Sequence, residues 1–201
     1  MDAREKILQA AAAVFAEVGF RGATTRRIAQ EAGVNEITLF RHFGSKERLL
    51  HAAIACADAL PPAAAALPEE PRRPRAELLA WARAHLNHLR AKRSFIRTCM
   101  AEIEEHPEMI PPDNPTVVSA RALRDYLLRL RTQGFTTASF DPAIAAPMFM
   151  GILFADAMGR DVMGELYRND PDVAVKHYVD LFLRALGVAR TAGSYRKERT
   201  A

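Results

Sequence analysis

The stretch "TTRRIAQEAGVNEITLFRHFGSKERLL", residues 24–50, consists of three short helical segments separated by glycines. Thr24, Asn35 and Ser45 are good N-cap residues, and each stands directly before one of these segments. Gly33 supplies the backbone freedom that a tight bend between two steeply crossing helices needs. The stretch therefore predicts a helix-turn-helix, with a second helix from Asn35 to about Phe43.

One longer helix is expected before this stretch. Asp2 and Glu5 stand at the spacing of a capping box, and Gly19 ends the segment. Apolar residues recur in it at intervals of 3.6 residues, at Ile7, Leu8, Ala11, Val14, Phe15 and Val18. Residues 1–50 therefore form a compact helical unit, and a fourth helix at about 45–60 links it to the rest of the chain.

The remainder of the chain is also predicted to be helical, because no stretch shows sustained two-residue alternation. Residues 61–75 contain five prolines and are expected to form a connector, since proline interrupts a helix. Longer helices follow at about 76–91, 94–106, 116–133, 141–159 and 171–186. The prediction is an all-α fold with an N-terminal domain, a larger C-terminal domain at 76–190 and a flexible tail at 191–201.

Composition restricts the class of protein. Hydrophobic residues make up 49% and charged residues 26% of 201 residues, a globular mixture. We find no run of about 18 apolar residues and no signal-peptide core, so neither a membrane span nor secretion is expected, and the predicted location is the cytoplasm. Cys56 and Cys99 are too few for a disulfide framework and are interpreted as buried hydrophobes, with a redox pair as the alternative.

Charge favours an anionic partner without requiring one. The formal net charge is +4, but residues 1–51 hold eight basic and six acidic side chains. A case for nucleic-acid binding must therefore rest on where the charges lie. The second helix of a helix-turn-helix fits the major groove of DNA. Without further support, solvated surface is the better explanation for Arg26, Arg27 and Arg41.

That support comes from a family pattern. From Arg4 to Leu50 the sequence resembles the N-terminal domain of TetR/AcrR-family (tetracycline-repressor-like) transcriptional regulators. The matching positions are Phe15, Gly19, Thr24, Ile28, Ala29, Ala32, Gly33, Val34, Leu39, Phe43 and Lys46. The resemblance covers about a quarter of the chain, and it implies a two-domain, all-helical regulator that binds double-stranded DNA.

The resemblance also implies a set of DNA-binding residues. These are Thr25, Arg26, Arg27, Asn35, Glu36, Ile37, Thr38, Phe40, Arg41, His42 and Lys46. Three of them depart from the pattern. The family often has Tyr at Phe40, a smaller residue at Ile37 and a basic or neutral residue at Glu36. We expect Glu36 either to accept from cytosine or to pair with Arg26 or Arg41, and Lys46 to lie along phosphates.

The C-terminal domain contains polar residues close to apolar helix faces, His85, His88 and Arg97 among them. Such a mixture is typical of a small-molecule site, although plain core is the alternative for each residue. The candidate effector-binding residues are Trp81, His85, His88, Cys99, Ile103, Tyr126 and Phe149. A metal enzyme is the rival class, but no Glu-x-x-His pair, Cys-x-x-Cys motif or Gly-rich phosphate loop is present, so neither a metal nor a cofactor is expected.

The last two long helices, 141–159 and 171–186, are rich in apolar and small residues, which suits burial against a second copy of the chain. The resemblance implies the same interface. The predicted function is that of a dimeric repressor which binds an inverted-repeat operator and is released by a small, largely apolar effector. A regulator under redox or protein-partner control and a helical enzyme are the alternatives.

Overall fold

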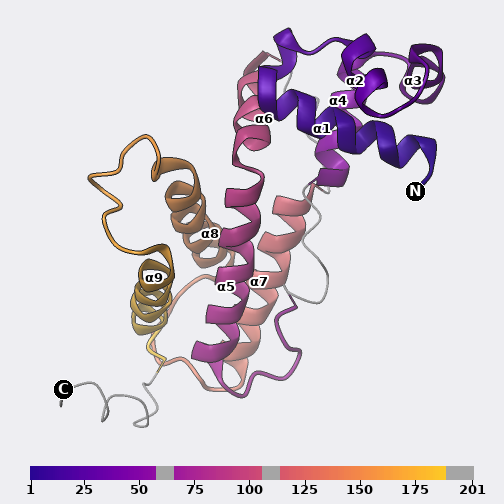
Figure 1. Ribbon diagram of the computed structural model, residues 1–201. Coiled ribbons are helices and arrows are strands. Elements are labelled where there is room, and N and C mark those ends of the chain that lie inside the picture. Colours follow the sequence, from indigo (N-terminus) through magenta and orange to yellow (C-terminus); the bar gives the residue numbers. More distant parts are fainter. Residues whose placement is uncertain (58–65, 106–113, 189–201) are drawn as a thin grey trace.

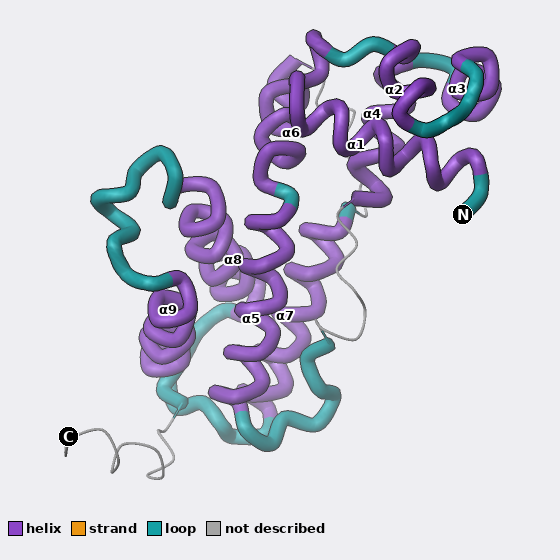
Figure 2. Tube along the Cα trace, viewed as in Figure 1, coloured by secondary structure: helices purple, strands orange, loops and turns teal. Residues whose placement is uncertain are grey.

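The computed structural model describes residues 1–57, 66–105 and 114–188, without the side chains of 55–57 and 104–105. Every regular element in these ranges is a helix, as predicted (Figures 1 and 2). The helices are α1 (Ala3–Gly22), α2 (Thr25–Glu31), α3 (Glu36–Phe43), α4 (Lys46–Ala57), α5 (Pro74–Ala91), α6 (Arg93–Glu105), α7 (Pro115–Thr132), α8 (Pro142–Gly159) and α9 (Pro171–Ala185). The Cys56 side chain, residues 61–65 of the connector, His106 and the tail at 191–201 lie outside the described residues.

The helix ends follow the capping chemistry that the sequence predicts. Asp2 and Glu5 form the capping box of α1, in which each side chain accepts from the other residue's backbone N–H. Gly19 breaks the helical backbone at φ 71°, and α1 then resumes for one short turn to Gly22. Four of the later helices begin at a proline in their first turn, where no backbone N–H donor is needed.

The buried apolar residues form two separate clusters. The N-terminal cluster contains residues of α1, α2, α3 and α4, with Ile7, Phe15, Ile28 and Leu39 fully buried. The C-terminal cluster joins α5, α7, α8 and α9, with Tyr126 and Phe149 at its centre.

Helix α6 belongs to the first of these clusters, although it follows the connector in sequence. Phe95 and Cys99 are buried among the N-terminal residues, and α6 packs against α1 (Figure 1). The two cores are therefore divided at the break between α5 and α6, beyond the connector at 61–75. The amphipathic pattern of α6 predicts a buried face but not which domain covers it.

Helix α8 corrects one expectation from composition. Its 18 residues are apolar enough, by length and composition alone, to cross a membrane, so the statement that no such run exists is wrong. Half of that window is buried inside the fold, against α5 and α7. Asp156 within it is fully buried and ion-paired. This packing is that of a core helix.

Candidate nucleic-acid interface and regulatory domain

The turn between α2 and α3 has the predicted helix-turn-helix chemistry. The Thr24 hydroxyl accepts from the Arg27 backbone N–H at 3.1 Å, which caps α2. Gly33 takes a φ of 65°, a left-handed conformation that favours glycine. The Asn35 side chain accepts from the Ile37 N–H at 2.9 Å and caps α3. Leu39 is fully buried and fastens α3 to the N-terminal cluster.

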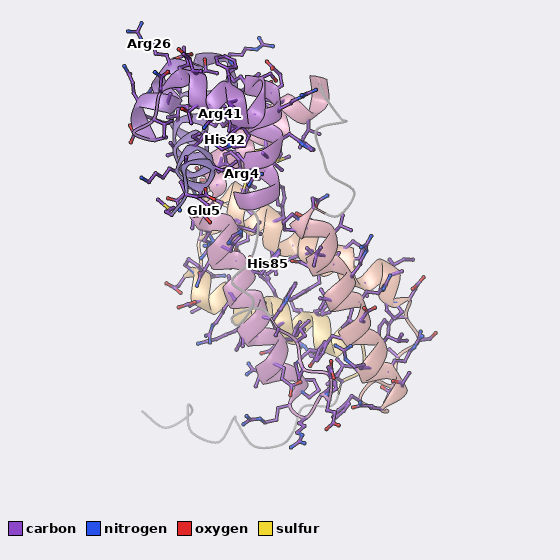
Figure 3. The ribbon with its side chains drawn as sticks, turned by 90° about the vertical axis from the view of Figure 1, so that its right-hand side faces the viewer. Arg4, Glu5, Arg26, Arg41, His42 and His85 are labelled. Carbon is purple, nitrogen blue, oxygen red and sulfur yellow. The ribbon has the colours of Figure 1, made fainter. Side chains whose placement is uncertain are left out.

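The other face of α3 is open to solvent and has an unusual composition. Ile37 is 75% exposed and Phe40 45% exposed, next to the exposed cations of Arg41 and His42. Arg26 of α2 is exposed on the same domain, and Figure 3 shows these cations at the end of the molecule away from His85. Fold stability does not call for two large apolar side chains in water, whereas base methyl groups and sugars would cover them.

Several predicted DNA-binding residues already have partners within the protein. The Thr25 hydroxyl donates to the Glu36 carboxylate at 2.6 Å, so Glu36 pairs with α2 through Thr25 and not through Arg26 or Arg41 as expected. The Arg27 guanidinium donates to Glu17 at 2.7 Å. This hydrogen bond and ion pair lower the pKa of Glu17 and raise that of Arg27.

Lys46 differs most from its expected position along phosphates. Its ammonium donates to the carbonyl oxygens of Phe20 and Ala23, at 3.0 and 3.1 Å, at the end of α1. The Phe20 carbonyl also accepts from the Ala23 backbone N–H, at the C-terminal end of α1 where carbonyl groups lack helical donors. Lys46 therefore joins the start of α4 to the end of α1. Thr38, the remaining predicted contact, is half-buried on α3.

One further cation lies beside this surface. The Arg4 guanidinium lies 5.6 Å from the centroid of the Phe43 ring, at the end of α3, and His42 lies beside the same ring at 6.2 Å. Arg4 is exposed and lies near His42 and Arg41 (Figure 3). The family pattern begins at Arg4, yet its residue type alone does not distinguish it from ordinary helix surface.

Four of the seven candidate effector-binding residues gather in the C-terminal core. Trp81 and His85 stack with ring centroids 5.0 Å apart. His85 is 6% exposed, and its Nδ1 is buried without a hydrogen-bond partner among the described residues. Burial, and secondarily the nearby His88, lowers the pKa of His85 to about 4, so this imidazole is neutral at physiological pH. Phe149 stacks on Phe182 at 4.4 Å.

Tyr126, the fourth of these residues, is fully buried, and its hydroxyl donates to Glu77 at 2.8 Å. Burial raises the pKa of Tyr126, and the hydrogen bond to Glu77 raises it further. The same carboxylate accepts from the backbone N–H groups of Arg72 and Arg73 and so caps α5. The Tyr126 hydroxyl therefore serves the fold rather than an open site.

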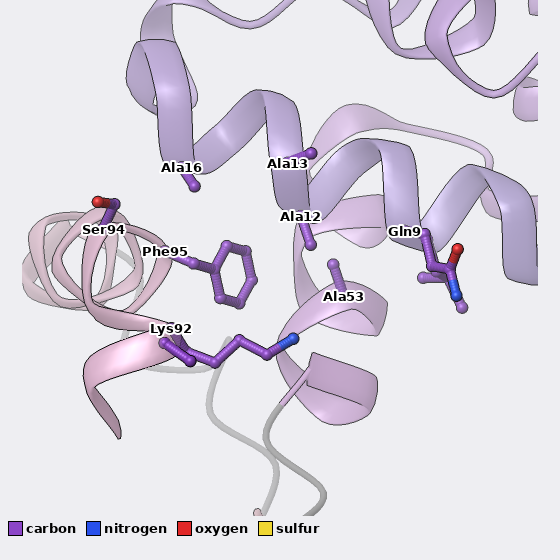
Figure 4. A pocket seen from close by; sticks show the side chains of 10 residues that line it. Gln9, Ala12, Ala13, Ala16, Ala53, Lys92, Ser94 and Phe95 are labelled. Atoms are coloured by element: carbon purple, nitrogen blue, oxygen red, sulfur yellow. The ribbon is translucent and has the colours of Figure 1, made fainter. Parts of the chain in front are cut away.

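Of the other three candidates, His88 lies next to this group, whereas Cys99 and Ile103 lie apart from it. His88 is half-buried on α5, one turn beyond His85. Cys99 and Ile103 lie on α6 in the N-terminal cluster, so the structure does not bring them together with Trp81. A hollow of about 580 Å³ lies instead between α1, α4 and the α5–α6 break, lined by Ala12, Ala16, Ala53, Lys92 and Phe95 among others (Figure 4). It contains none of the seven candidate residues.

A buried carboxylate in the C-terminal domain escaped the sequence analysis. Asp156 of α8 is fully buried, accepts from Arg90 at 2.6 Å and from Arg160 at 2.8 and 2.7 Å, and accepts from the Tyr178 hydroxyl at 2.8 Å. Burial opposes its ionisation, but these hydrogen bonds prevail and lower the pKa of Asp156. The signal was available, because Asp156 is the one charged residue of 142–159.

The described residues contain no group of three His, Cys, Asp or Glu side chains able to hold a metal ion. The N-terminal domain contains a helix-turn-helix with an exposed second helix. In DNA-binding regulators of the helix-turn-helix class, this second helix contacts the bases. Residues 7–53 match the model of the bacterial regulatory proteins of the tetR family. Over these residues the N-terminal domain therefore matches the TetR family, as the sequence pattern indicates.

Curated relatives agree over the same region. The HTH-type transcriptional repressor AcnR of Corynebacterium efficiens is 43% identical over 49 residues, which is 24% of this chain and 26% of AcnR. The HTH-type transcriptional repressor KstR2 of Mycobacterium tuberculosis is 47% identical over 47 residues, 23% of this chain and 24% of KstR2. The match therefore spans about a quarter of the length of these relatives.

Solved structures resemble the whole chain. The TetR-family regulator PfmR of Thermus thermophilus is 26% identical with a TM-score of 0.68, over 94% of this chain and 99% of PfmR. The fatty acid degradation regulator FadR of Bacillus halodurans is 22% identical with a TM-score of 0.74, over 91% of this chain and 95% of FadR. More than nine-tenths of the chain therefore aligns with the fold of these regulators, and this includes the C-terminal domain.

Proposed function

We propose that the protein is a sequence-specific DNA-binding transcriptional regulator, acting in the cytoplasm as a repressor. The observation that carries this proposal is the exposed face of α3, where Ile37 and Phe40 stand in solvent beside Arg41. Its opposite face is fastened by Leu39, so the helix can enter the major groove as a rigid unit. The repressor relatives with the same N-terminal domain support the sign of regulation.

The base-reading residues on this proposal are Arg26, Ile37, Thr38, Phe40 and Arg41, with His42 and Arg4 toward the phosphates. Arginine is the commonest reader of guanine, and Ile37 offers an apolar contact to a thymine methyl. Four other predicted residues support the DNA-binding surface without reading bases, because their polar atoms make hydrogen bonds within the N-terminal domain. They are Thr25, Arg27, Glu36 and Lys46.

The proposed active form is a homodimer through α8 and α9. Ile144, Met148 and Ile152 recur at every fourth residue of α8 and are 67%, 51% and 37% exposed. On α9, Val173 and Leu181 are 41% and 58% exposed. A second copy would remove these side chains from water, and its two-fold symmetry would demand an inverted-repeat operator.

The proposed effector-binding site lies around Trp81 and His85. A buried imidazole nitrogen without a partner is costly, and a ligand group that hydrogen-bonds it would recover that cost. The surrounding aromatic residues favour a small, largely apolar compound. Stabilisation of the chain by such a compound, and loss of that effect in His85→Phe, would support this part.

The test of DNA recognition is selection of bound sequences from random DNA by the purified chain at moderate salt. A palindromic motif is expected from the unaltered chain, and Arg41→Ala should weaken it. Arg124→Ala is the matched control, since it removes a cation from the exposed surface of α7. Recovery of no motif from a well-folded dimer would refute the proposal.

A further inference from the structure

Helices α5 and α6 form one rod with a break at Lys92. Helix α5 ends at Ala91 and α6 starts at Arg93, while Lys92 leaves the helical conformation at φ −102° and ψ 5°. Helix α5 packs in the C-terminal bundle and α6 packs against α1, so the rod connects the two cores (Figure 1). The angle at Lys92 therefore determines the direction in which the N-terminal domain points.

Arginines on both sides of this break hold the same end of α8. Before the break, Arg90 donates to the buried Asp156 at 2.6 Å. After it, Arg97 donates to both oxygens of Asp161, at 2.8 and 2.7 Å, and to the Met158 carbonyl oxygen at 2.5 Å. We call Arg90, Arg97, Asp156 and Asp161 the brace.

The opposite face of α6 holds the N-terminal domain. Phe95 and Cys99 are buried in the N-terminal cluster, and the Thr98 hydroxyl donates to the Phe15 carbonyl oxygen at 3.0 Å. Residues 95 and 97 lie about 200° apart around a helix, so one helix presents its two sides to two different domains. Helix α6 therefore contacts both the end of α8 and α1.

The two halves of the brace differ in solvent exposure. Asp156 is fully buried, whereas Arg97 and Asp161 are 38% and 35% exposed, so the second ion pair adds little to the stability of the fold. A planar guanidinium that makes three hydrogen bonds nevertheless fixes direction as well as distance. Loss of the Arg97 side chain should therefore allow the angle between α5 and α6 to vary without unfolding the chain.

We propose that the brace positions the N-terminal domain relative to α8, and so sets the spacing of half-sites that a dimer recognises. The second clause rests on the proposed function, because α8 is the proposed dimer helix. Any ligand or partner that shifts the end of α8 then alters DNA binding through α6, by favouring one angle at Lys92 over others. Arg97 and Asp161 are positioning residues in this account and contact no DNA.

The first experiment needs no DNA. Spin labels on non-natural residues at exposed positions Gln30 and Ala122 report the distance between the two domains within one chain. Labelled chain diluted with unlabelled chain avoids signals between copies. Arg97→Gln should roughly double the width of the distance distribution, and Arg97→Lys should restore part of the order. Arg124→Gln, which breaks a half-exposed ion pair with Asp125, should leave it unchanged. An unchanged width in Arg97→Gln would overturn the proposal.

The second experiment varies the spacer between operator half-sites, one base pair at a time. The unaltered chain should prefer one spacer, and Arg97→Gln should lose at least about threefold of that preference. A variant that is merely destabilised would bind every spacer more weakly by the same factor, which would count against positioning. If the unaltered chain binds no DNA, the proposed function is wrong. The distance measurement would still test whether the brace positions the N-terminal domain.

Discussion

The ammonium of Lys46 lies 4.2 Å from the centroid of the Phe20 ring and donates to the Phe20 carbonyl oxygen at 3.0 Å. It thus closes the end of α1 by charge, hydrogen bond and contact with an aromatic face. A phosphate contact would have left this lysine extended into solvent. The position is a joint between α1 and α4, and we expect DNA binding to depend on it only indirectly.

Replacement of this lysine tests the joint. Lys46→Met keeps the aliphatic stem and removes the donors, and we expect it to lower the free energy of unfolding by about 1–2 kcal/mol. Denaturant unfolding measures this, with Lys92→Met as a control that removes a half-buried lysine of the α5–α6 break. The contrary result is a Lys46 variant that is as stable as the unaltered chain and shows a flatter salt dependence of DNA binding. That result would mean that Lys46 contacts phosphates.

The pair of Thr25 and Glu36 gives a second prediction. Glu36→Gln keeps an acceptor for the Thr25 hydroxyl but removes a negative charge from the surface proposed to face phosphates. We expect DNA affinity to rise at low salt, with the preferred sequence unchanged. Glu36→Ala should lose the hydrogen bond as well and cost about 1 kcal/mol of stability. A changed base preference in Glu36→Gln would show that Glu36 reads a base.

Local chemistry explains why the N-terminal domain could be predicted from sequence. The caps at Asp2, Thr24 and Asn35 and the positive φ at Gly33 all depend on residues within a few positions of one another. These residues determine the backbone conformation at their own positions. The sequence pattern therefore predicts closely where the helices start and where the chain turns.

The C-terminal domain was less predictable because its decisive contacts are remote in sequence. Arg97 meets Asp161 and Arg90 meets Asp156 over separations of 64 and 66 residues. A helical stripe that contains Cys99 indicates burial but not the partner, which is why the expected grouping of Cys99 with Trp81 does not occur. The ion pair of Arg27 with Glu17 was missed because it depends on how α1 packs against α2, which the helical pattern of each segment does not specify.

His85 predicts how stability depends on pH. Its pKa is about 4 in the folded chain and about 6.5 when unfolded, so the unfolded chain binds more protons between these values. Stability should therefore fall as the pH falls from about 6.5 to 4, by up to about 3 kcal/mol. His85→Phe should flatten this part of the profile in urea titrations at each pH. A profile equally steep in the variant would assign the effect to other groups.

Asp156 predicts a second, more acidic transition. Its pKa is lowered in the folded chain, so its contribution to stability is complete above its ordinary value of about 3.9 and is lost as the pH falls through the folded value. Asp156→Asn should destabilise the chain by about 2–4 kcal/mol at neutral pH, because Arg90 and Arg160 lose a buried partner.

The same measurement from pH 7 to pH 3 distinguishes this network from surface ion pairs. The difference between Asp156→Asn and the unaltered chain should shrink as the carboxylate becomes protonated. Asp125→Asn is the control, since its pair with Arg124 is about half exposed and should change stability little at any pH. A constant difference across the range would mean that Asp156 acts by packing alone, and the pairing with Arg90 would then carry no weight in holding α5 against α8.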